Sequence, residues 1–337
     1  MRTLTIETLE LPLARPFVIA RGARTAVPVV RVTLTEDGVS ASGECSPNAR
    51  YQAYPDDICR QLETLRAAIE TGLSRQQLGR LLPPGSARNA LDCALWRLEG
   101  ALRGQSLWQL TGRTPPVAGA IVCAQTLSLG PAASMASAAA EAVGGGARLL
   151  KIKLDRQQIL EKVAAIRASA PRATLIIDAN EAWAGVDLAS LFAALQTYGI
   201  AMIEQPLPAG QDADLLRCVH PIPICADESC HSAVDIAGLR GRYDMINIKL
   251  DKCGGLSEAL AMVAEAKLQG MRVMVGCMLG SSLAMEAALP VAIDAEFVDL
   301  DGPLWLAQDA APHLQYGQGQ VSWVPLAGAR LTANGGA

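Results

Sequence analysis

RLLKIKLD at residues 148–155 and ATLIIDAN at residues 173–180 share one pattern, in which a short apolar run ends in charged or polar residues. A stretch of helical character separates the two runs. A buried strand followed by a helix and then by another buried strand is typical of a parallel βαβ unit. These stretches therefore predict a parallel sheet whose strands end in polar side chains.

The same pattern continues on both sides of this pair. The other runs are AIVCAQT (120–126), IAMIEQP (200–206), IPICADES (222–229), MINIKLD (245–251), RVMVGCM (272–278) and AEFVDLDGP (295–303). From the second run onward the polar ends, 22 to 28 residues apart, are Lys153, Asp178, Glu204, Asp227, Lys249, Cys277 and Asp299. That spacing fits one strand, one helix and two loops, and eight such strands close a barrel. We predict an α/β fold, a modified (β/α)8 TIM barrel of the (β/α)7β kind, over residues 114–312.

The residues before the barrel show another order, with strands first and helices second. From Asp56 to about Gly112 the apolar residues recur at helical spacing. Before them, apolar and polar residues alternate as in strands at residues 2–9, 29–35 and 40–44. Strands followed by helices favour a compact α+β unit, so we expect a capping domain over residues 1–113. The tail, residues 313–337, alternates again, and we expect it to return to the capping domain.

The composition excludes several classes of protein. The 337 residues carry 29 Lys and Arg against 33 Asp and Glu, a net charge of −4 that lacks the basic excess of a nucleic-acid binder. No apolar run approaches the roughly 18 residues of a membrane span, and the N-terminus lacks the apolar core of a signal peptide. We expect a cytoplasmic protein without nucleic-acid or membrane partners, and a homo-oligomer stays open.

Cysteine and histidine usage argues against several kinds of site. The nine cysteines include no CxxC pair, and only three histidines are present. These counts disfavour a zinc site, a disulfide framework and a His-based triad, and the chain has no G-x-S-x-G motif of a hydrolase. Cys225 and Cys230 flank the ADES stretch, and we interpret them as packing residues.

Charged residues end five successive barrel strands, where the carboxyl ends converge on one mouth. Burying a charge is costly unless it is paired or metal-bound, so charges in register indicate a site rather than solvated loops. Asp178, Glu204 and Asp227 form an all-oxygen set from neighbouring strands, which favours Mg²⁺ with positions left for substrate and water. We expect Asn180, two residues beyond Asp178, to lie on the same side of the strand and help position the site.

Three lysines share the predicted mouth. Lys151 and Lys153 should both project into the barrel while Ile152 faces the helices, and Lys249 lies four strands later, opposite them. A lysine acts as a base only if its pKa falls from about 10.4 toward neutrality, and we expect Mg²⁺, burial and a second lysine to lower it. We interpret Lys153 and Lys249 as bases on opposite faces of a substrate, and we expect the positive charge of Lys151 to lower the pKa of Lys153. A metal-bound carboxylate stabilises the enediolate that forms when the adjacent C–H loses its proton.

The KIK pair, the D-x-N after a strand, the EQP, the ADES and the NIKLDKCGG stretch together resemble the enolase superfamily, in its muconate-lactonizing-enzyme subgroup. The resemblance covers essentially the whole chain. FVIARGAR, GEC, ARNALDCALW, PICADESCH, GCML and DLDGP are similar to stretches of the dipeptide epimerases that interconvert L-Ala-L-Glu and L-Ala-D-Glu in murein (peptidoglycan) peptide recycling. The resemblance implies an isomerase that works by two-base 1,1-proton transfer, with one Mg²⁺ per chain and no organic cofactor.

The resemblance also implies a set of residues that bind the dipeptide. Asp299 and Asp301, alternate residues of one strand, would hold its α-ammonium group. Arg24 in the RGAR stretch would pair with the γ-carboxylate of the glutamyl side chain, with Arg21 as its competitor. The rest of the set is Thr126 and Cys277, which would line the pocket, and Lys151, which would touch the substrate carboxylate.

Three rival functions stay open. In the same subgroup, o-succinylbenzoate synthase and muconate cycloisomerase share the lysines and metal ligands but hold no substrate ammonium, so Asp299 and Asp301 argue against both. A dipeptide epimerase with another specificity, such as Ala-Asp or a broader Ala-Xaa set, is the second, since the capping loops near Arg24 and Tyr51–Tyr54 decide specificity. The third, a barrel that only binds a metabolite, is disfavoured by the intact set of bases and ligands.

Overall fold

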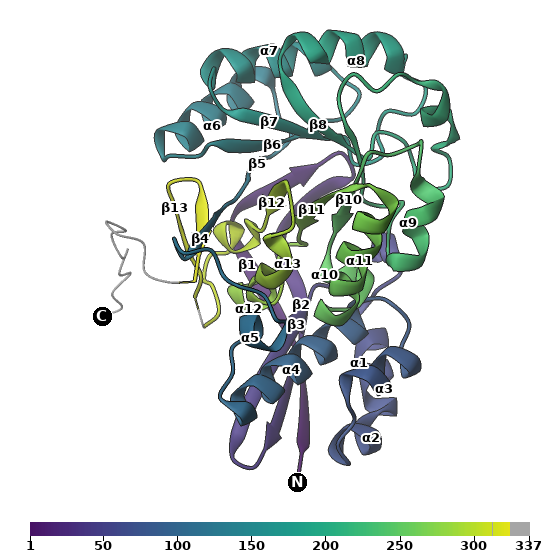
Figure 1. Ribbon diagram of the computed structural model, residues 1–337. Coiled ribbons are helices and arrows are strands. Elements are labelled where there is room, and N and C mark those ends of the chain that lie inside the picture. Colours follow the sequence, from purple (N-terminus) through teal and green to yellow (C-terminus); the bar gives the residue numbers. More distant parts are fainter. Residues whose placement is uncertain (312, 324–337) are drawn as a thin grey trace, which may run out of the picture.

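An eight-stranded parallel sheet forms the centre of the computed structural model, which describes residues 1–311 and 313–323 (Figure 1). Its strands are β5 (Gln125–Leu127), β6 (Leu149–Lys153), β7 (Thr174–Asp178), β8 (Ile200–Glu204), β9 (Ile224–Ala226), β10 (Met245–Ile248), β11 (Arg272–Gly276) and β12 (Phe297–Asp299), hydrogen-bonded in sequence order. Beside the two outer strands, Ala124 N donates to Val298 O (2.7 Å), which brings the sheet close to a closed barrel. The predicted barrel is confirmed.

Helices connect most successive strands on the outside of the barrel (Figure 1). They are α6 (Ala132–Gly144), α7 (Ile159–Ser169), α8 (Leu188–Thr197), α9 (Ala233–Leu239), α10 (Leu250–Cys253), α11 (Leu256–Gln269), α12 (Ser282–Glu286) and α13 (Leu289–Ala292). Between β8 and β9 the connection holds only the 3₁₀ turn η2 (Ala213–Arg217). Within the described residues, β12 is followed by the 3₁₀ turn η3 (Gly302–Trp305) and not by an α-helix, in agreement with the (β/α)7β form.

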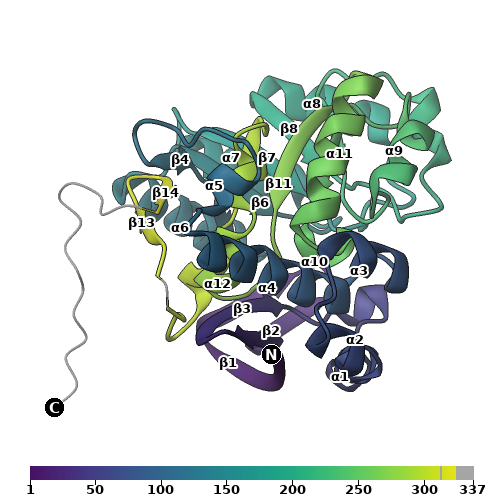
Figure 2. The ribbon, with the colours of Figure 1, turned by 60° about the horizontal axis from the view of Figure 1, so that its bottom comes forward.

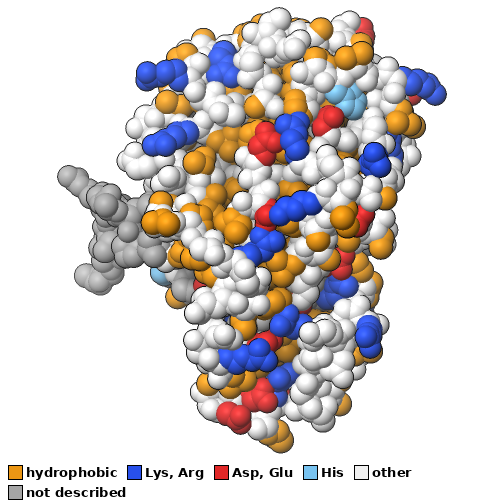
Figure 3. All heavy atoms as spheres, viewed as in Figure 1, with side chains coloured by type: hydrophobic (Ala, Val, Ile, Leu, Met, Phe, Trp, Pro, Cys, Tyr) orange, Lys and Arg blue, Asp and Glu red, His pale blue; other side chains and the backbone are white. Residues whose placement is uncertain are grey.

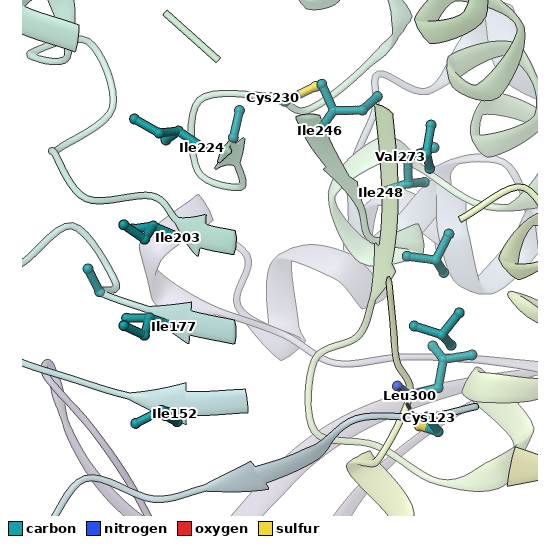
Figure 4. Packing of buried hydrophobic residues seen from close by; sticks show 14 of the residues in the cluster. Cys123, Ile152, Ile177, Ile203, Ile224, Cys230, Ile246, Ile248, Val273 and Leu300 are labelled. Atoms are coloured by element: carbon teal, nitrogen blue, oxygen red, sulfur yellow. Dashed lines mark hydrogen bonds between the residues drawn. The ribbon is translucent and has the colours of Figure 1, made fainter. Parts of the chain in front are cut away.

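Alternate residues of each barrel strand face opposite sides of the sheet. Figure 4 shows Ile152, Ile177, Ile203 and Ile224 in a row on consecutive strands, and all four belong to the apolar layer shared with the helices. Residues of the other parity fill the barrel, where a separate apolar floor consists of Ala124, Leu149, Ile176, Met202, Cys225, Met245, Met274 and Phe297. Two residues further along each strand come Thr126, Lys151, Asp178, Glu204, Asp227, Asn247, Gly276 and Asp299. A polar layer therefore lies directly above an apolar floor.

Cys225 and Cys230 are packing residues, as the sequence predicts. Cys225 belongs to the floor of the barrel and Cys230 to the layer between sheet and helices, and both are fully buried. All nine cysteines are free thiols.

The predicted first strand, residues 120–126, is two strands in the structure. β4 (Ala120–Val122) pairs antiparallel with β14 (Gln320–Ser322), which in turn pairs with β13 (Gln315–Gly317), whereas β5 pairs with β6. The break lies at Cys123, whose N–H donates to Gly319 O (3.0 Å). One apolar run thus contains strands of two different sheets. The periodicity of its residues does not indicate this division.

The described part of the tail pairs with β4, and its Trp323 packs against Trp108 with 5.0 Å between ring centroids. Trp108 lies within the predicted capping domain. Residues 312 and 324–337 lie outside the described residues, so the return of the whole tail to the capping domain stays a prediction. The domain boundaries after residues 113 and 312 stay predictions as well.

The N-terminal residues form an antiparallel sheet covered by helices, the α+β cap that the sequence predicts (Figure 2). The strands are β1 (Thr3–Ile19), β2 (Gly22–Glu36) and β3 (Val39–Cys45), and the helical segments are η1 (Ala49–Tyr51), α1 (Pro55–Thr64), α2 (Arg66–Glu70), α3 (Arg75–Leu81), α4 (Ser86–Arg103) and α5 (Leu107–Leu110). Helix α4 packs on β3. An apolar core of its own, between sheet and helices, holds this unit together.

The β1–β2 hairpin is longer than the sequence predicts for its two strands. Pairing continues past Pro12 and Phe17, between which the register shifts, to Ile19 opposite Gly22. Pro28 therefore lies inside β2, on a part of the strand that has only β1 beside it. The prolines interrupt the alternation of apolar and polar residues, so the periodicity ends both strands too early.

The tip of this hairpin reaches the carboxyl ends of the barrel strands. Val18 O accepts a hydrogen bond from Leu129 N (3.0 Å), and the ring of Phe17 packs edge-on against Trp305 with 4.7 Å between centroids. Arg24, expected in a loop, stands on β2 opposite Phe17, which corrects that expectation. The cap thus contributes a two-stranded ribbon to the mouth of the barrel.

The outer surface carries charges of both signs. On the face seen in Figure 3, Lys and Arg side chains are interspersed with Asp and Glu. No helix in residues 1–311 and 313–323 is long and apolar enough to cross a membrane.

The contact between β3 and α4 allows no side chain at Gly43. A Cβ atom there would overlap Ala90 O and lie 2.7 Å from Ala94 N. We expect Gly43→Ala to lower the free energy of unfolding by ~1–3 kcal/mol or more, because backbone atoms must move. Urea denaturation followed by circular dichroism measures the change.

The matched control is Gly79→Ala on α3, where an added Cβ meets nothing within 4 Å. This change should leave stability equal or slightly higher, since alanine favours a helix over glycine. Equal stabilities for the two variants would contradict the close β3–α4 contact.

Candidate active site

Three carboxylates stand side by side at the carboxyl ends of neighbouring strands. Asp178 ends β7, Glu204 ends β8 opposite it in register, and Asp227 follows β9. All three are at most 1% exposed. Burial and the charge of Asp178 raise the pKa of Glu204. Burial would also raise the pKa values of Asp178 and Asp227, but the lysines beside them lower both below the usual range.

A lysine contacts the carboxylate at each flank of this row. Lys153 Nζ donates to Asp178 Oδ2 (2.6 Å), and Lys249 Nζ donates to Asp227 Oδ2 (2.6 Å). Lys153 ends β6 beside β7, and Lys249 follows β10 beside β9, so Glu204 on β8 lies between them. The two lysines therefore stand on opposite sides of the row, as a two-base reaction requires.

Without a metal ion beside it, Lys249 has a raised pKa, so the lowering predicted for the site with bound Mg²⁺ stays a prediction. Burial lowers its pKa, but Asp227 and Glu204 raise it by more, and the net shift is upward. The ammonium of Lys151 acts on Lys249 in the predicted direction with a smaller effect. The expected lowering took into account the positive charges near the lysine, but not the carboxylates that contact its ammonium and raise its pKa.

Lys151 is the central cation of the polar layer. Its Nζ lies 2.7 Å from both Glu204 Oε2 and Asp299 Oδ2, and 3.3 Å from Asp178 Oδ2. The side chain is 1% exposed, and although burial lowers its pKa, Asp299 and the other carboxylates raise it well above the usual value. Lys151 is therefore a fixed positive charge that links the carboxylate row to Asp299.

The donor set of the row fits a hard divalent cation. Glu204 Oε2 and Asp227 Oδ1 are buried without a hydrogen bond of acceptable geometry, although lysine ammonium groups lie 2.7 and 2.6 Å away. Buried carboxylate oxygens with free lone pairs are the ligands that Mg²⁺ prefers. Among the described residues no three Asp, Glu, His or Cys side chains are placed together so that they could hold a metal ion, and each carboxylate of the row contacts a lysine instead.

Asn180 acts on the row through its backbone. Its N–H donates to Asp178 Oδ1 (2.9 Å), while its side-chain Oδ1 is buried without a hydrogen bond. The residue lies beyond the end of β7 with φ 45°, not on the strand as expected. A left-handed backbone turns the N–H toward the carboxylate, which strand periodicity does not predict.

A cavity of about 350 Å³ lies between the polar layer and the cap, within the size range of small-molecule sites. On the side of the barrel it is lined by Lys153, Lys249, Asp227 and Asn180. All residues predicted to bind substrate also line it: Arg24, Thr126, Lys151, Cys277, Asp299 and Asp301.

Asp299 and Asp301 lie together on one wall of the cavity. Asp299 ends β12, and Asp301 lies beyond the strand at the start of η3, which corrects their expected place on one strand. Asp301 Oδ2 accepts hydrogen bonds from Thr126 N (2.7 Å) and Trp305 Nε1 (3.4 Å). Burial and the charge of Asp299 raise the pKa of Asp301 to about 6. Burial and the same two acids raise the pKa of the Cys277 thiol, which stays neutral.

The two arginines of the hairpin differ in their contacts. Arg21 Nη1 lies 2.9 Å from Glu228 Oε1 and 3.2 Å from Glu181 Oε2, and it donates to Asn180 O (3.1 Å). Arg24 lines the cavity, and its side chain has no hydrogen bond or ion pair with a described residue. Arg21 is thus engaged by the barrel, whereas Arg24 is free for a ligand.

Three polar residues beside the row were not predicted from the sequence. Asn247 Nδ2 donates to Glu204 Oε1 (2.7 Å), Lys252 contacts Asp227, and Glu228 faces Arg21. Burial and the charge of Asp227 raise the pKa of Glu228 to about 8. Alternation along the strand places Asn247, two residues before Lys249, on the same side as Lys249, so the sequence could have predicted it. Nothing in the sequence pattern indicates Lys252 or Glu228.

The chain matches two family models. Residues 1–112 match the mandelate racemase / muconate lactonizing enzyme N-terminal domain, and residues 134–325 match the enolase C-terminal domain-like family. The chain is 48% identical over 321 residues to the L-Ala-D/L-Glu epimerase of Escherichia coli K12, covering 95% of this chain and 99% of that protein.

Solved structures agree with these matches. An enolase family member from Agrobacterium tumefaciens, with homology to dipeptide epimerases and with bound sodium and L-Ala-L-Glu, has a TM-score of 0.91 at 45% identity, covering 96% of this chain and 98% of that one. A dipeptide epimerase from Enterococcus faecalis complexed with Mg and L-Leu-L-Tyr has a TM-score of 0.85 at 27% identity, with coverages of 95% and 96%.

The Arg21 contacts predict that this side chain fastens the hairpin tip to the barrel. In Arg21→Met the buried Glu228 carboxylate loses its cation and the tip loses three contacts, so the backbone amides near residues 18–24 should exchange hydrogen faster. Hydrogen–deuterium exchange with mass spectrometry measures this. Arg60→Met, which removes an exposed ion pair on α1, is the control. Unchanged exchange at the tip would rule out the fastening role.

Proposed function

The chain belongs to the mandelate racemase/muconate lactonizing enzyme family of the enolase superfamily, and we propose that it is a Mg²⁺-dependent dipeptide epimerase that interconverts L-Ala-L-Glu and L-Ala-D-Glu. One observation carries the proposal. Lys153 and Lys249 flank a row of buried carboxylates from opposite sides at the base of a cavity. This arrangement suits removal of a proton from one face of a carbon and its return on the other.

The carboxylates Asp178, Glu204 and Asp227 are the proposed holders of Mg²⁺. Mg²⁺ bound there supplies a Lewis acid to the C-terminal carboxylate of the dipeptide and offsets the negative charge that both lysines face. Asn180 N–H orients Asp178, and the Asn247 amide orients Glu204.

Lys153 and Lys249 are the proposed bases, one for each configuration of the glutamyl α-carbon. In each direction one lysine, in its neutral form, takes the α-proton, and the ammonium of the other gives a proton to the opposite face. Charge then develops on the substrate carboxylate, and Lys151 stands near it as a fixed cation. Each of the two lysines is oriented by a hydrogen bond to a carboxylate of the row, Lys153 to Asp178 and Lys249 to Asp227.

Substrate recognition is assigned to the remaining walls. Asp299 and Asp301 supply the negative charge that a dipeptide ammonium needs, and Thr126 and Cys277 line the space between. Arg24 is the proposed partner of the γ-carboxylate, because Arg21 is already engaged. The acid pair disfavours o-succinylbenzoate synthase and muconate cycloisomerase activity, since neither reaction uses an ammonium.

We further propose that the two parts of the chain have different functions. The capping domain, residues 1–113, would select the substrate side chain through its hairpin, and residues 114–312 would carry the reaction. We assign the enzyme to the cytoplasm and to the recycling of murein peptides, which contain the L-Ala-D-Glu unit.

Proton exchange tests the reaction directly. With Mg²⁺ in D₂O, L-Ala-L-Glu should acquire deuterium at the glutamyl α-carbon and yield L-Ala-D-Glu, both observable by proton NMR. N-acetylated L-Ala-L-Glu, which lacks the ammonium, is the substrate control and should react far more slowly. Absence of exchange at the α-carbon would reject the epimerase assignment.

Variants of the two lysines extend this test. Lys153→Ala and Lys249→Ala should each slow epimerisation by about 10²–10⁴-fold, the usual contribution of a general base. Each variant should still exchange the α-proton of one epimer, and the surviving epimer should differ between them. If both variants kept exchange of the same epimer, the lysines would not serve opposite faces.

Arg24→Met tests side-chain specificity. It should reduce kcat/KM for L-Ala-L-Glu by about 10–100-fold, the range expected from loss of charged hydrogen bonds, and change that for L-Ala-L-Leu little. Arg21→Met is the comparison, and it should affect both dipeptides alike. An equal loss on the two dipeptides in Arg24→Met would remove Arg24 from the specificity role.

A further inference from the structure

Lys252 is a buried lysine that the proposed mechanism leaves without a role. It lies on α10, three residues after Lys249, and is 3% exposed. It is not part of the cavity wall, so it cannot touch a substrate there. A lysine is rarely buried in this way unless its charge is fully compensated.

Four oxygen atoms surround the ammonium of Lys252. Asp227 Oδ1 lies 2.6 Å from Nζ, and Nζ donates to the carbonyl oxygens of Cys230 (2.9 Å) and Asn247 (3.0 Å) and to that of Asp227 itself. An ammonium has three N–H donors, which the three carbonyls can accept, and the carboxylate supplies the opposite charge. Carbonyl oxygens with one carboxylate around a compact cation also form the kind of shell that a bound monovalent cation needs.

The contacts of Lys252 reach two of the three proposed metal ligands. At Asp227, Lys249 donates to Oδ2 and the Lys252 ammonium lies 2.6 Å from Oδ1, so a positive charge faces each oxygen of the carboxylate. The Asn247 carbonyl belongs to the residue whose side chain donates to Glu204. The Cys230 carbonyl ties down the turn that follows Asp227. One cation thus joins β9, β10 and the turn after β9.

We propose that the Lys252 ammonium is a built-in monovalent cation that positions Asp227 and Glu204 for metal binding, and that its removal leaves a site that accepts an ammonium ion. The proposal rests on the proposed function only in taking those two carboxylates as metal ligands. Lys252 is therefore a positioning residue.

The test uses the full chain of Lys252→Ala, without dipeptide. Mg²⁺ affinity is measured by titration calorimetry, and Tm by thermal unfolding, in ammonium chloride and in tetramethylammonium chloride at equal ionic strength. We expect Mg²⁺ affinity to fall about 10–100-fold, as for loss of other groups that orient metal ligands. Ammonium should restore much of the affinity and raise Tm, whereas tetramethylammonium, which is larger and has no N–H donor, should do neither.

Two variants control for the loss of a buried lysine. Lys162 is 4% exposed and contacts one carboxylate, Asp155 (3.0 Å), so Lys162→Ala should show no preference for ammonium over tetramethylammonium. Lys252→Gln fills the space without a charge and should bind Mg²⁺ weakly in either salt. If Lys252→Ala does not fold alone, its refolding yield in the two salts gives the same comparison.

The outcomes separate this proposal from the proposed function. Equal behaviour of Lys252→Ala in the two salts, or Mg²⁺ affinity within about twofold of the unchanged chain, overturns the internal-cation role. If the unchanged chain binds no Mg²⁺, the metal site fails, and the dependence of Tm on ammonium still decides whether Lys252 occupies a cation site.

Discussion

The charged site at the mouth of the barrel depends on compensation of the repulsion between carboxylates that are buried side by side. Asp178, Glu204 and Asp227 stand on neighbouring strands at most 1% exposed, where like charges are far more costly than in water. The balancing charges also come from the barrel: the acids of the layer, Asp178, Glu204, Asp227 and Asp299, face the lysines Lys151, Lys153, Lys249 and Lys252. These four acids and four lysines balance one another in formal charge. Most of them have more than one partner, but removing Asp178 would leave Lys153 without its carboxylate.

Parallel strands provide the geometry for such a layer. Each strand contributes an apolar residue to the floor and, on every strand except β11, where Gly276 stands, a polar residue to the mouth two positions later. The opposite faces of the same strands pack their isoleucines against the helices, so the backbone beneath the charged groups is rigid. The charges thus stand in fixed positions before a ligand arrives, which reduces the reorganisation that binding and reaction require.

Strand periodicity predicts the parts of the molecule that repeat. The barrel, the carboxylate row and the two flanking lysines follow from runs whose polar ends recur at regular spacing. Features that depend on a single local geometry do not follow. The left-handed turn at Asn180, the split of residues 120–126 between two sheets and the length of the proline-containing hairpin are of this kind. Lys252 does not follow from the pattern, because a helix residue beyond a strand carries no parity signal. The raised pKa of Lys249 depends on distances to carboxylates that spacing does not give.

Arg24 lies on a paired strand, so the number of residues in the hairpin determines which face of the ribbon its side chain occupies. Side chains on a ribbon alternate between its two faces, so inserting or deleting one residue between the turn and Arg24 would turn the guanidinium to the other face of the ribbon. A change of two residues would keep it on the same face and shift it along the ribbon instead. A substitution at residue 24, in contrast, would change the side chain and leave the pairing of the ribbon as it is.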